Sequence, residues 1–133
     1  MSVHTFWIVA VGLSAALVGG APAAFAHEMT ERYIPVGQSP GLSGRYTVIG
    51  TLQSINTRDQ TVAIAGPAGA SSAKITQRTK IWVDRSKLGL THLRGTLADL
   101  RPGLTVEVKH EGHARGVSSG PAEWIKVQLP ESR

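Results

Sequence analysis

The chain has 133 residues, which allows one small domain with one hydrophobic core. It contains no cysteine, which excludes disulfides, a thiol nucleophile and thiolate metal sites. Its formal net charge is +5, and the excess of basic residues lies within Lys74–Arg101, a balance that favours anionic partners. A solvated loop surface is the competing interpretation of this basic segment.

The first 26 residues have the pattern of a secretory signal peptide. Phe6–Val18 is an almost unbroken apolar run, and the small-residue site Ala24-Phe25-Ala26 follows it, although Met1–Thr5 has no Lys or Arg. The run is too short to span a bilayer comfortably, and no second apolar run follows. We therefore predict cleavage between Ala26 and His27, and a periplasmic or secreted mature protein without a transmembrane anchor.

Glycines and prolines in residues 27–44 predict an extended, turn-rich arm ahead of the folded domain. Residues 45–129 then carry strand signals, with a small-residue loop at Gly66–Ser72 and one helical turn at Leu97–Leu100 that Thr96 caps. Gly50 and the offset from Leu52 to Ile55 predict a bulge in the first strand. Residues 130–133 form a polar tail. Five strands are expected, at Tyr46–Asn56, Thr61–Ala65, Lys74–Asp84, Leu104–His110 and Ala122–Leu129.

Five strands with one helical turn between the third and the fourth predict an all-β fold, a small OB-like Greek-key barrel that leaves little open edge. The chain also resembles a family of small exported bacterial OB-like barrel domains of unknown function, and the resemblance spans Gly50 to Leu129. It implies the same fold and carries over no catalytic residue. The segments that carry it are Gly50–Ile55, Thr79–Ile81, Leu97–Gly103, Val106–Val108 and Ala122–Val127.

The sequence gives little sign of catalysis. The nucleophile-elbow pattern G-x-S-x-G is absent, and most carboxylates fall at turns or on the polar faces of strands. A small filled barrel also offers little cleft for a substrate. We therefore expect a protein that is not an enzyme.

A copper site is one functional hypothesis. Cleavage after Ala26 makes His27 the N-terminal residue, with an amine and an imidazole together, and Met29 adds a thioether suited to Cu(I). His110 and His113 place two further imidazoles on one expected loop. The competing interpretation needs no metal. The residue after a signal peptide is often arbitrary, and histidines in loops are usually solvated.

The two tryptophans of the mature chain suggest a binding face. Strand parity turns Trp82 and Trp124 away from the core, and exposed tryptophans often mark recognition of a ligand. The competing interpretation is that the arm, with its apolar segment Tyr33–Val36, folds back and covers them. The candidate ligand-binding residues are Trp82, Trp124, Lys80, Arg85 and Lys126.

These observations predict an exported, non-catalytic binding or structural accessory module of the cell envelope. Its expected partner is an anionic ligand, a glycan or a protein, and nucleic acid is excluded by location and by the few aromatic residues. No cofactor is expected. The alternative is a periplasmic copper-binding protein that uses His27, Met29, His110 and His113.

Overall fold

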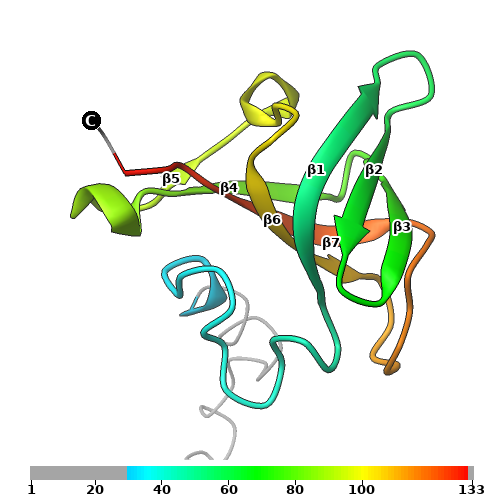
Figure 1. Ribbon diagram of the computed structural model, residues 1–133, viewed down its shortest axis with the longest axis horizontal. Coiled ribbons are helices and arrows are strands. Elements are labelled where there is room, and N and C mark those ends of the chain that lie inside the picture. The colour runs from blue at the N-terminus through cyan, green and yellow to red at the C-terminus, as the bar shows by residue number, and fades with distance from the viewer. Residues whose placement is uncertain (1–29, 132–133) are drawn as a thin grey trace, which may run out of the picture. The chain divides into compact units, whose positions relative to one another are not determined.

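A computed structural model describes residues 30–131, and these residues form an all-β domain (Figure 1). The predicted signal peptide, His27 and Met29 lie outside the described residues. No helix within residues 30–131 is long and apolar enough to cross a membrane. The strands are β1 (Val48–Asn56), β2 (Thr61–Gly66), β3 (Gly69–Lys74), β4 (Lys80–Asp84), β5 (Leu93–Arg94), β6 (Thr105–His110) and β7 (Ala122–Gln128), with the 3₁₀ turns η2 (Ser86–Leu88) and η3 (Leu97–Asp99) between β4 and β6.

The described strands form one mixed sheet in the order β3-β2-β1-β6-β7-β4-β5. All neighbours are antiparallel except β4 and β7, which run parallel with Trp82 opposite Lys126. An isolated parallel bridge joins Lys74 to Pro121, between the end of β3 and the start of β7. The all-β class is therefore confirmed, whereas the described sheet has seven strands and is not closed.

The expected third strand, Lys74–Asp84, is divided by a turn. The backbone N–H of Thr76 donates to Thr79 Oγ1 at 2.9 Å, and the Thr79 hydroxyl donates to the carbonyl of Ala122 at 2.7 Å. These bonds hold the chain out of the sheet between β3 and β4. The prediction of a loop at Gly66–Ser72 is wrong for the second half of that segment, which belongs to β3 and pairs with β2. Its small residues have little intrinsic strand preference, so the neighbouring strand decides its conformation.

The inner face of the sheet forms the larger hydrophobic core. Alternate residues of β4, β6 and β7 point into it, as the sequence predicts. The predicted bulge in β1 is confirmed between Leu52 and Ser54. Gly50 allows β1 to approach β2 closely, since a Cβ there would lie 2.3 Å from the carbonyl oxygen of Ala65. Fully buried members of the core include Leu52, Ile64, Val106, Val108, Ile125 and Val127.

The predicted arm, residues 27–44, is described from residue 30 onward. Residues 31–47, which extend three residues beyond the predicted end and are called the arm from here on, pack on the opposite, outer face of the sheet. Leu42 of the arm forms a second apolar cluster with Trp82 and Trp124, and Tyr46 packs against its side. The indole rings lie 5.7 Å apart at an angle of 34°, and the two residues are 3% and 1% exposed. The prediction that both tryptophans point away from the inner core is confirmed. Of the two interpretations, cover by the arm is confirmed, and an exposed binding face at these residues is wrong.

The predicted helical turn after residue 96 is confirmed as η3 (Figure 1). The backbone N–H of Thr96 donates to Asp99 Oδ2 at 2.7 Å, which is one half of the expected capping box. The turn places Leu100, which is buried, against the inner core. This segment therefore connects β5 to β6 and covers part of the core.

Candidate functional site

Buried charges lie between the arm and the outer face of the sheet. Glu107 on β6 is fully buried, and both of its carboxylate oxygens accept hydrogen bonds from the arm. Oε1 accepts the backbone N–H of Gly37 at 2.8 Å, and Oε2 accepts the hydroxyls of Ser43 at 2.6 Å and Thr47 at 2.8 Å. The arm therefore satisfies a charge that would otherwise destabilise the interior.

Lys126 on β7 makes a second buried link. Its ammonium group lies 2.6 Å from Glu31 Oε1, and both side chains are at most 1% exposed. Ser39 of the arm donates its hydroxyl to the same carboxylate. The ammonium group also lies 4.6 Å from the centre of the Trp124 ring, within the range of a cation–π interaction. Lys126 therefore stabilises the attached arm and is not available to a ligand.

Asp84, at the end of β4, forms the third link. Its carboxylate accepts the backbone N–H groups of Val36 at 2.9 Å and Ser86 at 2.8 Å, and the amide of Gln128 at 3.1 Å. Burial alone raises the pKa of Asp84, but these hydrogen bonds together outweigh it and hold the pKa below its usual value of 3.8.

His92 also joins the arm to the sheet. Its Nε2 lies 2.9 Å from Asp84 Oδ1, and its Nδ1 donates to the carbonyl of Arg32 at 3.0 Å. Both ring nitrogens thus face oxygen atoms, one on the sheet and one on the arm. The histidine is buried and its contacts are internal, as expected for a structural residue.

The candidate ligand-binding residues are therefore brought together, but mostly in a buried layer. Trp82, Trp124 and Lys126 lie under the arm, and half-buried Lys80 begins the same strand, β4, as Trp82. Arg85 bends back onto its own loop, where its Nε donates to the carbonyl of Thr91 at 2.6 Å. The described fold offers no exposed aromatic platform at these residues.

The predicted copper ligands within the described residues have separate partners. His110 is buried, and its Nε2 donates to the carbonyl of Ser72 at 2.8 Å. His113 stacks on Tyr46, with ring centres 4.1 Å apart. Residues 30–131 contain no group of three or more His, Asp or Glu side chains placed to hold a metal ion. The part of the copper hypothesis that depends on His27 and Met29 stays a prediction.

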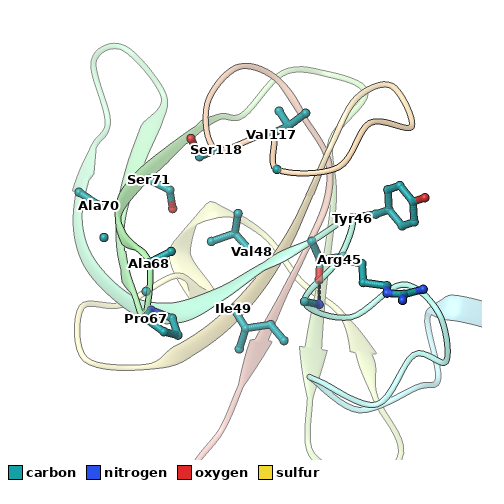
Figure 2. A pocket seen from close by; sticks show the side chains of 15 residues that line it. Arg45, Tyr46, Val48, Ile49, Pro67, Ala68, Ala70, Ser71, Val117 and Ser118 are labelled. Carbon is teal, nitrogen blue, oxygen red and sulfur yellow. Dashed lines mark hydrogen bonds between the residues drawn. The ribbon is translucent and has the colours of Figure 1, made fainter.

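A pocket of about 460 Å³ lies beside the free edge of β3 (Figure 2), and we call it the edge pocket. Its walls come from the end of the arm, the start of β1, the β2–β3 hairpin and the loop between β6 and β7. Figure 2 shows Val48 near its centre, Ile49 below, and Val117 and Ser118 above. The lining residues are 44–49, 66–71 and 116–118.

Most of this lining is apolar, and its polar groups are few. Arg45 is exposed and is the one charged side chain among the residues that line the pocket. The hydroxyl oxygen of Ser71 is buried and has no hydrogen-bond partner within the described structure. An apolar pocket with a cation and a free hydroxyl is typical of a ligand site.

Sequence reasoning missed the edge pocket. Arg45 and Tyr46 fall where the arm meets the first predicted strand, and Ser71 falls within the segment predicted as a loop. The only sequence signal was the run of small residues at Gly66–Ser72, which leaves room beside the backbone because it lacks large side chains.

The fold and site define an all-β domain with a buried polar layer and a small pocket at a sheet edge. Comparison of the sequence with protein-family models and with curated proteins finds no match. Among solved structures, one similar chain is a variant of CusF from Escherichia coli, solved at 1.0 Å with Cu(II). The TM-score is 0.39 at 14% identity, and the alignment covers 64% of this chain and 92% of that chain. A similarity this low assigns neither fold nor ligand.

Proposed function

We propose that this chain is a non-catalytic binding module of the cell envelope, and that it binds an amphipathic anion in the edge pocket. The observation that carries the proposal is the pocket lining, which is mostly apolar and whose one charged residue is the exposed cation Arg45, with no carboxylate among the lining residues. The export and the envelope location in this proposal rest on the signal-like first 26 residues.

The chemistry of the lining favours this class of ligand. Val48 and Val117 provide an apolar surface against which a hydrocarbon group loses its contact with water. Arg45 offers a planar cation that binds carboxylate or phosphate oxygens. A volume of about 460 Å³ suits a small molecule or the end of a chain.

The buried tryptophans make a stacked sugar ring a poorer candidate. Glycan recognition would use exposed aromatic faces, and Trp82 and Trp124 lie beneath the arm. Opening that face would also leave Glu107 without its three donors from the arm. The edge pocket, by contrast, is accessible without any rearrangement of the arm.

We further propose that the sheet is a partly open OB-like barrel, as in the family that the chain resembles. In this interpretation β3 and β4 are two halves of one interrupted strand. The sheet order and the bridge from Lys74 to Pro121 support it, because β3 and β4 then lie along the same strand, β7.

A titration followed by two-dimensional NMR tests the binding proposal. Hexanoate, added to the isotopically labelled protein, should shift the amide signals of residues that line the edge pocket. Arg45→Gln should weaken binding about tenfold, because it removes the charge-assisted hydrogen bonds to the carboxylate. Arg58→Gln, in the exposed turn between β1 and β2, is the matched control and should bind as the unaltered chain does.

Two results contradict the proposal. If hexanoate shifts no amide signal of a residue that lines the pocket, the pocket does not bind amphipathic anions. Equal affinities for the unaltered chain and Arg45→Gln show that the cation does not contribute to binding.

A further inference from the structure

β3 is the last strand at one end of the sheet, and the loop between β6 and β7 pairs with part of its outer edge. The backbone N–H of Ser72 donates to the carbonyl of Ser118, and that of Lys74 donates to the carbonyl of Gly120, both at 2.9 Å. The carbonyl of Ser72 accepts the ring N–H of His110. The loop therefore extends the sheet beyond β3. It runs in the same direction as β3, so that a step of two residues along the strand matches a step of two residues along the loop.

This pairing stops at the edge pocket. The same register would place Gly116 opposite Ala70, yet no hydrogen bond joins these two residues in the described structure. Gly116 has φ of 72°, which turns the loop away from the strand. Both residues line the edge pocket. The pocket is therefore a gap of about one residue pair in the edge pairing, consistent with the two-residue hydrogen-bond repeat of an edge strand.

The backbone of Ala70 points into this gap. In an antiparallel pair, N–H and C=O groups point alternately toward the partner strand and away from it. Ser72 and Lys74 direct their N–H groups away from β2, so Ala70, two residues before Ser72, does the same. An outward N–H and an outward C=O are what an added strand requires.

We propose that the edge pocket binds the end of an extended peptide that carries a free C-terminal carboxylate. This inference rests on the proposed function and names its ligand class. One peptide residue pairs with Ala70 and continues the ladder that the loop leaves at Ser118. An apolar peptide side chain packs on Val48, and the carboxylate binds Arg45.

Charge complementarity selects this occupant. Arg45 is the one charge among the residues that line the pocket, so a bound chain end brings the opposite charge. The hydroxyl of Ser71, buried without a partner, provides a further donor beside the bound backbone. A second copy of this chain fits less well, because a formal net charge of +5 on each copy opposes their association.

The test uses one peptide, acetyl-Ala-Val-Ala-Val with a free carboxylate, and its C-terminal amide, each titrated into the labelled protein. The acid should bind about tenfold more tightly than the amide, because only the acid pairs with Arg45. The amide proton of Ala70 should move downfield on binding.

Two variants separate the ladder from the pocket. Ala70→Pro removes the outward N–H at an edge position, where proline is tolerated, and should weaken peptide binding about fivefold. Ala70→Ser keeps the N–H and is the matched control, with peptide affinity as in the unaltered chain.

Each contrary result has a distinct meaning. If hexanoate binds but Ala70→Pro and the unaltered chain bind the peptide equally, the peptide inference is overturned and the proposed function stands. If neither hexanoate nor the peptide binds, both are overturned. If the Ala70 signal shifts with protein concentration alone, the edge pairs with a second copy and the inference is also overturned.

Discussion

The two faces of the sheet are buried in different ways. The inner face is filled by aliphatic side chains, such as Val106 and Ile125, that have no polar groups to satisfy. The outer face buries Glu107, Lys126 and Asp84 beneath the arm, and each has hydrogen-bond partners there. The inner core is stabilised by removal of apolar surface from water, and the outer layer by specific pairing of buried charges.

This difference affects how each face responds to mutation. Loss of an aliphatic group leaves a cavity, and neighbouring residues relax partly into it. Loss of one partner of a buried ion pair leaves a charge in the interior with no compensation. The outer layer should therefore tolerate paired substitutions and respond strongly to single ones.

The largest effect is expected from Lys126→Ala. It removes the buried ion pair with Glu31, and should lower the free energy of unfolding by about 3–5 kcal/mol in urea titrations. The double variant Lys126→Met with Glu31→Leu should restore most of this loss, because neither charge of this pair is then buried. A loss for Lys126→Ala below about 1 kcal/mol, as expected for an exposed pair, would show that the buried pair does not hold the arm.

A matched control for that variant is Arg78→Gln. It breaks an ion pair of 3.1 Å with Glu111 in which the Arg78 side chain is 77% exposed. The expected loss is below about 1 kcal/mol, because water and salt screen an exposed pair. The contrast between the two variants isolates burial as the cause.

Ile125→Ala tests the inner face beside Lys126 on the same strand. We expect a loss of about 2–5 kcal/mol in the same urea titrations, because the substitution removes buried methylene groups and leaves a cavity. Amide hydrogen exchange in the arm should accelerate no more than the lower free energy of global unfolding requires. Selective acceleration of exchange in the arm would contradict the separation of the two faces.

A smaller effect is expected from Ser43→Ala, which removes one of the donors to Glu107. Hydrogen bonds to charged groups contribute about 1.5–3 kcal/mol, so the arm should open more often while the sheet stays folded. Hydrogen exchange at the Gly37 amide should accelerate as a result. Ser119→Ala, in the exposed loop before β7, is the control, and equal exchange rates in both variants would contradict the role of Ser43.

The smallest expected effect is a change in how stability depends on pH, and it concerns Asp84. The folded pKa of Asp84 lies below the usual value of 3.8, so its contribution to stability is fully present above that value. The contribution is lost as the pH falls through the lower, folded pKa. Asp84→Asn should therefore flatten the decline of stability below about pH 4, measured by urea unfolding at several pH values. If stability declines in Asp84→Asn as it does in the unaltered chain, other carboxylates cause the decline and the prediction is wrong.

The alternation of apolar residues in the strands predicted the inner core, because a strand with one buried face repeats every two residues. It also placed Trp82 and Trp124 correctly on the opposite face. Their burial depends on contacts between residues far apart in the chain, such as Glu31 and Lys126, which are separated by 95 positions. Local patterns do not specify such pairs, so the cover provided by the arm was one of two open interpretations.

The sequence predicted neither the division of the third strand nor the edge pocket, and the reasons are related. The turn at Thr76–Thr79 depends on a hydroxyl that reaches Ala122 on another strand. All residues of β3 before Lys74 are small, so the pairing with β2 and with the loop near Ser118 determines its conformation. The pocket exists where that pairing ends, a feature of tertiary structure without a motif of its own.

The most direct test of this account is acrylamide quenching of tryptophan fluorescence in the chain from His27 onward, which contains only Trp82 and Trp124. The account predicts weak quenching in the folded protein, because both rings are at most 3% exposed, and strong quenching only after urea unfolds it. Lys126→Ala should show intermediate quenching below its unfolding transition. Quenching of the native chain as strong as that of the unfolded chain would contradict the account, because the arm would not cover the outer face.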